Sequence, residues 1–290
     1  MALLMTGERR ALVIIAFAVA VVSFAAILIR LCTVSTAVIA AWRLSLASVI
    51  LLPLYAGQKG WRQISGRQWW LCALSGLFLS LHFLFWIASL RLTTVASSVV
   101  LVTTSPIFAA IFAWIVLREG LRTRTMVAIG FCLLGGVIIG RGDMHLGRKE
   151  LLGDLYALAG AAGFGAYFVT GRSVRRTVTF LPYVFSAYAF AALMLLAWAV
   201  LTRQHLTGFA PVNYLWLVLL ALGPQVFGHS SLNWALGYLP APKVAISVLG
   251  EPIGSALLAW LIFHEVPGLP LFIGGALILY GVYLAMSERN

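Results

Sequence analysis

A stripe of polar side chains interrupts an apolar stretch near residue 230. Gln225, His229 and Asn233 follow one another at intervals of four residues, which places them on one face of a helix. Such a stripe can line a binding cavity, because amide and imidazole groups offer hydrogen-bond donors and acceptors. It can equally join neighbouring helices by hydrogen bonds. Both interpretations stay open, and we include these residues and Trp234 among the candidates for substrate binding.

A second stripe, formed by Lys243, Ser247 and Glu251, has the same spacing. Its ammonium group suits a substrate carboxylate, and its carboxylate suits a substrate ammonium or a proton. In the alternative interpretation, Lys243 reaches the membrane surface and Glu251 is a structural partner or part of a gate. Gly250 and Gly254 flank Glu251 and allow a substrate or a helix to approach closely.

Further candidates lie in other apolar stretches. His82 and Trp86 are one helical turn apart, and an imidazole beside an indole suits an aromatic or zwitterionic ligand. Ser98 belongs to a cluster of hydroxyl residues before Pro106, and Tyr188 is an aromatic residue that can form a cavity wall. Helix packing, or hydroxyl groups that bond to their own backbone, also explains these residues.

The composition indicates that the chain that carries these candidate residues is a membrane protein. Of 290 residues, 62% are hydrophobic and 10% are charged, whereas a soluble domain has about 25% charged residues. A water-soluble fold cannot hide this much apolar surface. The net charge of +12 is spread between apolar stretches, which is typical of membrane-protein loops and gives no sign of nucleic-acid binding.

Ten apolar segments are long enough to cross a bilayer, which needs about 20 residues for each helix. They cover residues 10–30, 36–56, 69–90, 94–117, 123–140, 153–172, 179–202, 213–236, 240–263 and 268–286. Their apolar residues are continuous rather than alternating, which favours helices over a β-barrel. We therefore expect an all-α membrane protein with ten transmembrane helices.

The positive charges predict the orientation of these helices, because Lys and Arg are enriched in cytoplasmic loops. With a cytoplasmic N-terminus, thirteen of the 20 basic residues face the cytoplasm, namely Arg9, Arg10, Lys59, Arg62, Arg67, Arg118, Arg122, Arg124, Arg172, Arg175, Arg176, Lys243 and Arg289. Six face the opposite side, namely Arg30, Arg91, Arg141, Arg148, Lys149 and Arg203, while Arg43 lies in the second span. We expect an inner (plasma) membrane protein with both termini in the cytoplasm.

The two halves of the chain resemble each other when the sequence is shifted by 146 residues. Pro106 then meets Pro252, and Glu119 meets Glu265. Because each half holds five spans, an odd number, the second half enters the membrane from the opposite face. We expect two inverted five-helix repeats around a central cavity, the architecture of many secondary transporters.

These repeats cover residues 9–140 and 153–287. Proline disrupts the helical hydrogen-bond ladder, and glycine allows close approach. The predicted hinge or gating residues are therefore Pro106, Pro252, Gly250 and Gly254.

Two stretches carry a resemblance to a known family. They read TTSPIFAAIFAWIVLRE over residues 103–119 and LGEPIGSALLAWLIFHE over residues 249–265. Both resemble the EamA family of the drug/metabolite transporter superfamily, and the resemblance covers nearly the whole chain. Residues 223–241, GPQVFGHSSLNWALGYLPA, resemble the YddG-type aromatic amino-acid exporters. The resemblance implies a basket-like bundle with a central cavity and efflux of amino acids or similar metabolites.

We therefore expect a secondary transporter that exports aromatic or neutral amino acids and related small metabolites by alternating access. We expect it to act in the lipid bilayer as a monomer or weak homodimer, with no cofactor, bound metal or nucleic-acid partner. Export of another metabolite or drug class is the alternative. The energy source stays open between proton exchange and facilitated efflux.

Two other classes are less well supported by the residues. An intramembrane enzyme needs a catalytic motif, and the start of HExxH at His264 lacks its second histidine because Gly268 occupies that position. A channel needs a continuous polar path or a filter, which two inverted halves of one chain do not favour.

Overall fold

The computed structural model describes residues 7–92, 98, 101–118, 120, 123–140, 148–264 and 269–287. Across these ranges the chain is helical and contains no β-strand. Seven helical segments in the described ranges are long and apolar enough to cross a membrane: Arg9–Leu31, Thr36–Gly57, Gly66–Ser89, Leu151–Arg175, Phe180–Leu201, Pro211–Ala235 and Ala241–Ile262. The expected all-α membrane protein is thereby confirmed.

Three shorter apolar helices accompany these spans, namely Ser105–Leu117, Thr123–Gly135 and Phe272–Gly281. Together the spans and the shorter helices fall on the ten segments expected from the sequence. The fourth, fifth and tenth segments are the shorter ones, so ten membrane crossings stay a prediction. Glu119 and Glu265, which support the internal repeat, lie outside the described residues.

The first half of the sequence contributes helices that are in part interrupted. They are α1 (Gly7–Val22), α2 (Phe24–Leu31), α3 (Thr36–Gly57), the 3₁₀-helix η2 (Gly60–Gln63), α4 (Gly66–Ser89), α6 (Ser105–Phe112), the π-helix η3 (Ala113–Leu117) and α7 (Thr123–Gly140).

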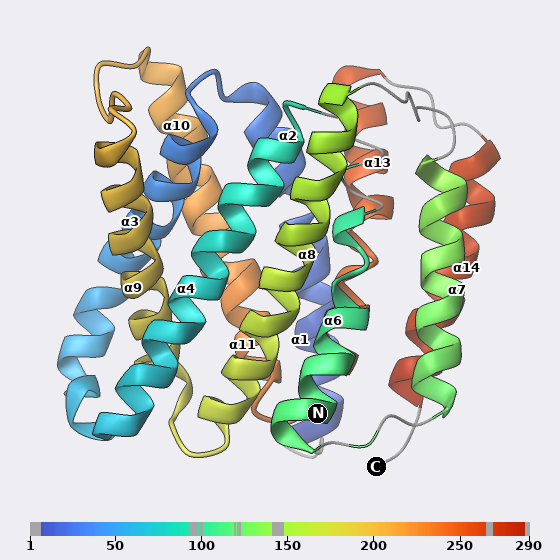
Figure 1. Ribbon diagram of the computed structural model, residues 1–290, viewed down its shortest axis with the longest axis horizontal. Coiled ribbons are helices and arrows are strands. Elements are labelled where there is room, and N and C mark those ends of the chain that lie inside the picture. The colour runs from blue at the N-terminus through green and yellow to red at the C-terminus, as the bar shows by residue number, and fades with distance from the viewer. Residues whose placement is uncertain are drawn as a thin grey trace.

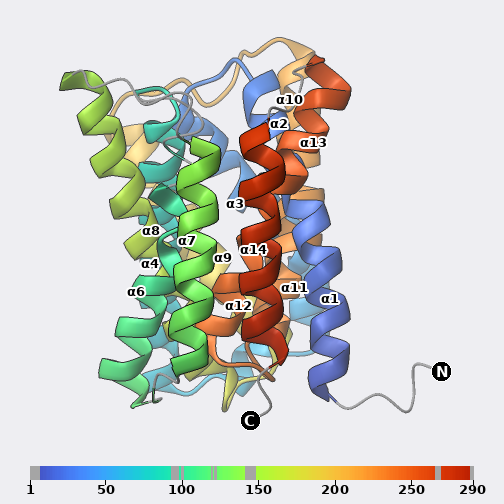
Figure 2. The same cartoon turned by 90° about the vertical axis from the view of Figure 1, so that its right-hand side faces the viewer.

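The second half contributes α8 (Arg148–Arg175), α9 (Phe180–Leu201), α10 (Pro211–Leu220), the π-helix η4 (Ala221–His229), α11 (Ser230–Ala235), α12 (Ala241–Val248), α13 (Glu251–Phe263) and α14 (Leu269–Ser287). Figure 1 shows that α1 and α8 run in opposite directions through the bundle, although each begins one half. Figure 2 shows that α1 begins and α14 ends at the same end of the bundle.

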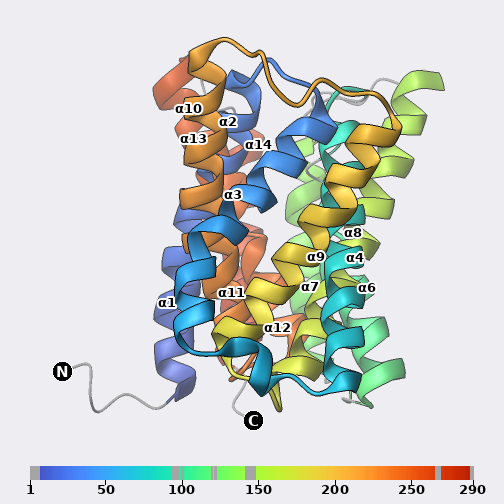
Figure 3. The ribbon, with the colours of Figure 1, turned by 90° about the vertical axis from the view of Figure 1, so that its left-hand side faces the viewer.

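The bundle is held together by pairs that join the two halves. Helix α7 packs along α14, α3 along α9, and α4 along α8. The α7–α14 pair forms one edge of the bundle (Figure 1), and Figure 3 shows α3 beside α9 on the opposite edge. Each half therefore buries its apolar faces largely against the other half.

Two helices that begin beside the cavity carry a proline in their first turn. Pro106 is the second residue of α6, and Pro252 is the second residue of α13. Proline lacks a backbone N–H, so it is tolerated in the first helical turn but interrupts a longer helix. The chain turns just before each proline, and these two turns lie beside the cavity described next.

A candidate substrate cavity

A cavity opens between the two halves of the sequence. It is lined by Ala25, Ala26, Arg43, His82, Trp86, Val102, Thr103, Ser105, Phe164, His229, Val248, Leu249, Glu251, Pro252 and Ser255. Its volume is about 610 Å³ when the space at its opening is included, but the centre of a water molecule fits within only about 50 Å³. This conformation has room for a few waters. A larger ligand requires side chains or helices to move.

Arg43 is the largest fully buried side chain of the described residues, with 0% of its surface exposed. It lies on α3, in the middle of an apolar span. Its Nε donates a hydrogen bond of 2.7 Å to Oε1 of Gln225, and its guanidinium carbon lies 4.4 Å from the ring centre of Phe83. Its two terminal nitrogens, Nη1 and Nη2, have no hydrogen-bond partner.

Stacked rings form a wall of the cavity. The imidazole of His82 is nearly parallel to the ring of Trp86, with centres 5.7 Å apart, and to the ring of Phe164, with centres 4.3 Å apart. His82 is fixed because its Nδ1 donates to the carbonyl oxygen of Gly160 at 3.0 Å, the carbonyl being an acceptor only. The indole Nε1 of Trp86 has no partner. The predicted pair therefore lines the cavity.

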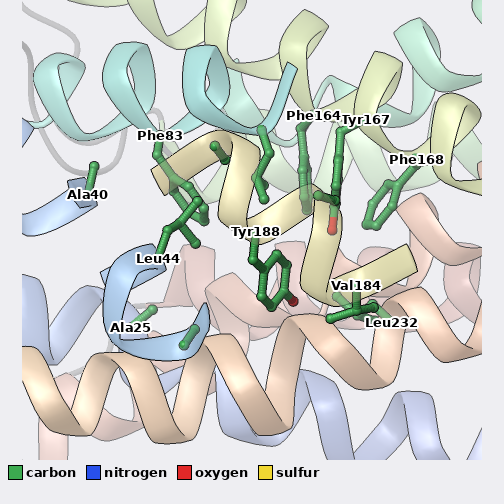
Figure 4. Packing of buried hydrophobic residues seen from close by; sticks show 14 of the residues in the cluster. Ala25, Ala40, Leu44, Phe83, Phe164, Tyr167, Phe168, Val184, Tyr188 and Leu232 are labelled. Atoms are coloured by element: carbon green, nitrogen blue, oxygen red, sulfur yellow. The ribbon is translucent and has the colours of Figure 1, made fainter. Parts of the chain in front are cut away.

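Figure 4 shows Phe164 projecting from the same helix as Tyr167 and Phe168, with Phe83 and Tyr188 nearby on other helices. The rings of Phe164 and Tyr167 are within 9° of parallel. The aromatic wall is thus continuous with the packed core, which fixes its orientation.

The first polar stripe is divided between the cavity and its supporting layer. His229 lines the cavity, whereas Gln225 lies behind it and holds Arg43. Asn233 donates to the His229 carbonyl oxygen at 2.8 Å and to the hydroxyl of Tyr167 at 2.5 Å. These residues lie in or just after η4, and a π-helix has more residues per turn than an α-helix. The spacing of four therefore does not bring all three side chains to one face.

The remaining members of this group also support rather than line the cavity. The hydroxyl of Tyr188 donates to the Gln225 carbonyl oxygen at 3.3 Å and lies 3.2 Å from the Ser230 hydroxyl. The ring of Trp234 lies 4.4 Å from that of Tyr238 at an angle of 39°, and Trp234 is not among the lining residues.

The second stripe is divided in the same way. Glu251 lines the cavity, but Lys243 and Ser247 do not. Ser247 donates to the Lys243 carbonyl oxygen at 2.9 Å, which is a bond within its own helix. Lys243 is 6% exposed and therefore does not extend into solvent. Ser98 lies 2.5 Å from the hydroxyl of Ser89 and also stands outside the lining.

The predicted hinge residues lie at and near the interrupted helices. Pro252 lines the cavity, and Pro106 follows Ser105, which lines it. A Cβ atom at Gly250 would lie 2.9 Å from the side chain of Val19, and one at Gly254 would collide with Ser23. Both glycines therefore permit close packing of this segment against α1 and its end.

Arg43 and Phe164 are lining residues that were not among the predicted site residues. The available signal for Arg43 was its position inside an apolar span, because a charge there is costly unless it meets a cavity or a partner. Phe164 carried no such signal, since an aromatic residue in an apolar helix is ordinary.

Comparison with known proteins places this geometry in context. The chain matches the EamA-like transporter family over residues 10–141 and 151–287. It is 26% identical over 260 residues to an uncharacterized transporter of Archaeoglobus fulgidus, covering 87% of this chain and 88% of that protein. It is 26% identical over 221 residues to the uncharacterized transporter YdfC of Bacillus subtilis, covering 73% and 71%. One crystal structure shares the fold, with a TM-score of 0.77 at 21% identity over 96% of both chains.

Proposed function

This chain belongs to the EamA-like transporter family, and on that premise we propose that it exports amino acids and related small metabolites across the plasma membrane by alternating access. The observation that carries the proposal is the cavity between the two halves, in which Arg43, Glu251 and an aromatic wall come together. Charged groups of both signs beside aromatic rings suit a small amphipathic molecule. The direction of transport rests on the resemblance of residues 223–241 to YddG-type exporters.

Alternating access is supported by the equivalence of the two interrupted helices. The Thr104 N–H donates to the Leu101 carbonyl oxygen at 3.1 Å, and the Gly250 N–H donates to the Ser247 carbonyl oxygen at 3.2 Å. These two bonds are related by the shift of 146 residues that aligns the halves. Helices α6 and α13 begin at equivalent positions, Ser105 and Glu251. Two equivalent bends beside one cavity provide one hinge for each half.

An inverted arrangement of the halves is supported by the α7–α14 pair. A side chain at Gly135 would collide with the Gly274 carbonyl oxygen, and one at Gly281 would meet the Ala128 carbonyl oxygen at 2.7 Å. The shift of 146 residues converts the first contact into the second. Ala128 faces Gly281 and Gly135 faces Gly274, so α7 and α14 are antiparallel. A two-fold axis that exchanges two antiparallel helices is perpendicular to them and therefore lies across the bundle. In a bilayer that axis lies in the membrane plane, as in inverted-repeat transporters.

Transport is tested with purified protein in liposomes loaded with radiolabelled L-phenylalanine, with L-leucine and L-alanine in parallel. We expect efflux that saturates with internal substrate and is absent from protein-free liposomes. Repeating it with an imposed pH gradient separates proton exchange from facilitated efflux. Lack of flux for these amino acids, together with flux of an unrelated metabolite from a broader panel, would replace the amino-acid assignment.

A further inference from the structure

Arg43 presents an unused binding group inside the protein. It is fully buried, yet only one of its three guanidinium nitrogens, Nε, has a hydrogen-bond partner. A buried charge is costly unless it is paired, and a charged donor without an acceptor adds to that cost. The side chain lines the cavity, so a ligand that enters the cavity can supply the missing acceptors.

The geometry points to Arg43 as the site that binds the substrate carboxylate. Arginine presents two parallel N–H groups to the two oxygens of a carboxylate, which lysine cannot do. Gln225 occupies Nε and therefore leaves the Nη1–Nη2 end free for this bidentate contact. The inference rests on the proposed function and deepens it, because it makes a carboxylate a required part of the substrate.

The guanidinium is held in place before a ligand arrives. Gln225 fixes its Nε, and the ring of Phe83 lies against its carbon at 4.4 Å. Gln225 belongs to a segment whose backbone accepts a hydrogen bond from Tyr188. A binding group that is already oriented loses less entropy on binding, which raises affinity.

Glu251 supplies a charge of the opposite sign in the same cavity. The two side chains do not form a hydrogen bond with each other, because both terminal nitrogens of Arg43 are without a partner and its Nε bonds to Gln225. A cation and an anion that line one cavity without bonding directly are complementary to a zwitterion. A ligand ammonium therefore lies toward Glu251 while its carboxylate lies on Arg43.

Three related compounds test this inference. L-Phenylalanine carries both charges, 3-phenylpropionate lacks the ammonium group, and 2-phenylethylamine lacks the carboxylate. Affinity is measured by the change in tryptophan fluorescence of the purified protein, and by competition with radiolabelled L-phenylalanine in liposomes. The variants are Arg43→Gln, Arg43→Lys, Glu251→Gln and the charge-matched control Arg203→Gln, whose side chain is exposed in a loop.

We expect Arg43→Gln to weaken binding of both carboxylates about tenfold or more, since hydrogen bonds between two charged groups are among the stronger ones. Its affinity for 2-phenylethylamine stays unchanged. Arg43→Lys keeps the charge but loses the bidentate contact, so its loss is smaller. Glu251→Gln weakens the binding of L-phenylalanine but not that of 3-phenylpropionate. Arg203→Gln leaves the affinity for all three compounds unchanged.

Folded Arg43→Gln protein that binds both carboxylates as well as wild type would overturn the inference, as would wild-type protein that binds neither. If Arg43→Gln does not fold, undiminished carboxylate binding by Arg43→Lys counts as the same negative result. Failure of the proposed function looks different. Wild-type protein then moves no amino acid, yet binds 3-phenylpropionate in a manner that depends on Arg43.

Discussion

The Nε atom of Arg43 and the Oε1 atom of Gln225 lie 2.7 Å apart in the buried interior, although 182 positions separate them in the chain. The bond joins α3 of the first half to η4 of the second half. It fixes a buried positive charge at the junction of the two halves, where the cavity lies. The side chain to which we assign the substrate carboxylate therefore also makes a buried hydrogen bond between the two halves.

Substitutions of Arg43 and Gln225 are predicted to have strongly non-additive effects on the stability of the protein. Gln225→Leu leaves a buried guanidinium with no hydrogen bond and is expected to lower the Tm most. Arg43→Met removes the charge but leaves the Gln225 amide unpaired at its oxygen, in addition to its Nε2, which has no partner in the wild-type protein. The double variant removes both polar groups and should recover much of the loss, because apolar replacement of both partners can be nearly neutral.

Thermal unfolding of the four proteins in detergent measures this coupling, which we expect to be about 0.5–3 kcal/mol. Exposed Arg203→Met serves as the control and should leave the Tm close to that of wild type. Simple addition of the two single losses in the double variant would contradict a direct interaction.

Substitution of either equivalent glycine in the α7–α14 pair is predicted to destabilise the protein by a similar amount. Gly135 and Gly281 each face backbone of the opposite helix at a distance that admits no side chain. Valine at either position should cost about 1–3 kcal/mol, the usual range for overpacking. Gly130, on the same helix as Gly135, has open space around it, so Gly130→Val is the matched control. Unequal losses for Gly135→Val and Gly281→Val would argue against the two-fold relation.

Replacement of the prolines in the first turns of α6 and α13 is predicted to slow transport more than it weakens binding. Pro106→Ala and Pro252→Ala restore a backbone N–H and favour continuation of the helix through the bend. We expect the maximal rate of L-phenylalanine efflux to fall about tenfold or less for each variant, with a smaller change in KM.

Pro53→Ala is the control for this experiment, because Pro53 also lies inside a helix but is exposed and away from the cavity. A change confined to KM in the cavity variants would indicate a contact with substrate rather than a hinge.

The orientation expected from the positive charges predicts which loops react with a membrane-impermeant maleimide added to intact cells. His205→Cys, in the loop between α9 and α10, should be labelled from outside, whereas Arg62→Cys, between α3 and α4, should be labelled only after the cells are opened. Both positions are exposed, and the native residues Cys32, Cys72 and Cys132 are buried. The reverse pattern of labelling would place the termini outside the cytoplasm.

The sequence by itself determined the class of this protein and the approximate positions of its apolar helices. Hydrophobic run length sets whether a helix can cross a bilayer, and this property is local, so the apolar segments lie where they were expected. The interruptions at Pro106 and Pro252 are local too, because a missing N–H acts within one helical turn. His82 and Trp86 were also identified correctly as neighbours, since four residues make about one turn.

Only the tertiary structure decided which polar residues face the cavity. Periodicity gives the face of a helix but not the helix that covers it, and η4 changes the periodicity itself. Gln225 therefore lies behind the cavity, while Arg43, from a helix in the other half, lines it. Which of these two residues lines the cavity depends on how the two halves pack together. A buried charge is placed by the partners that surround it and by the space left beside it.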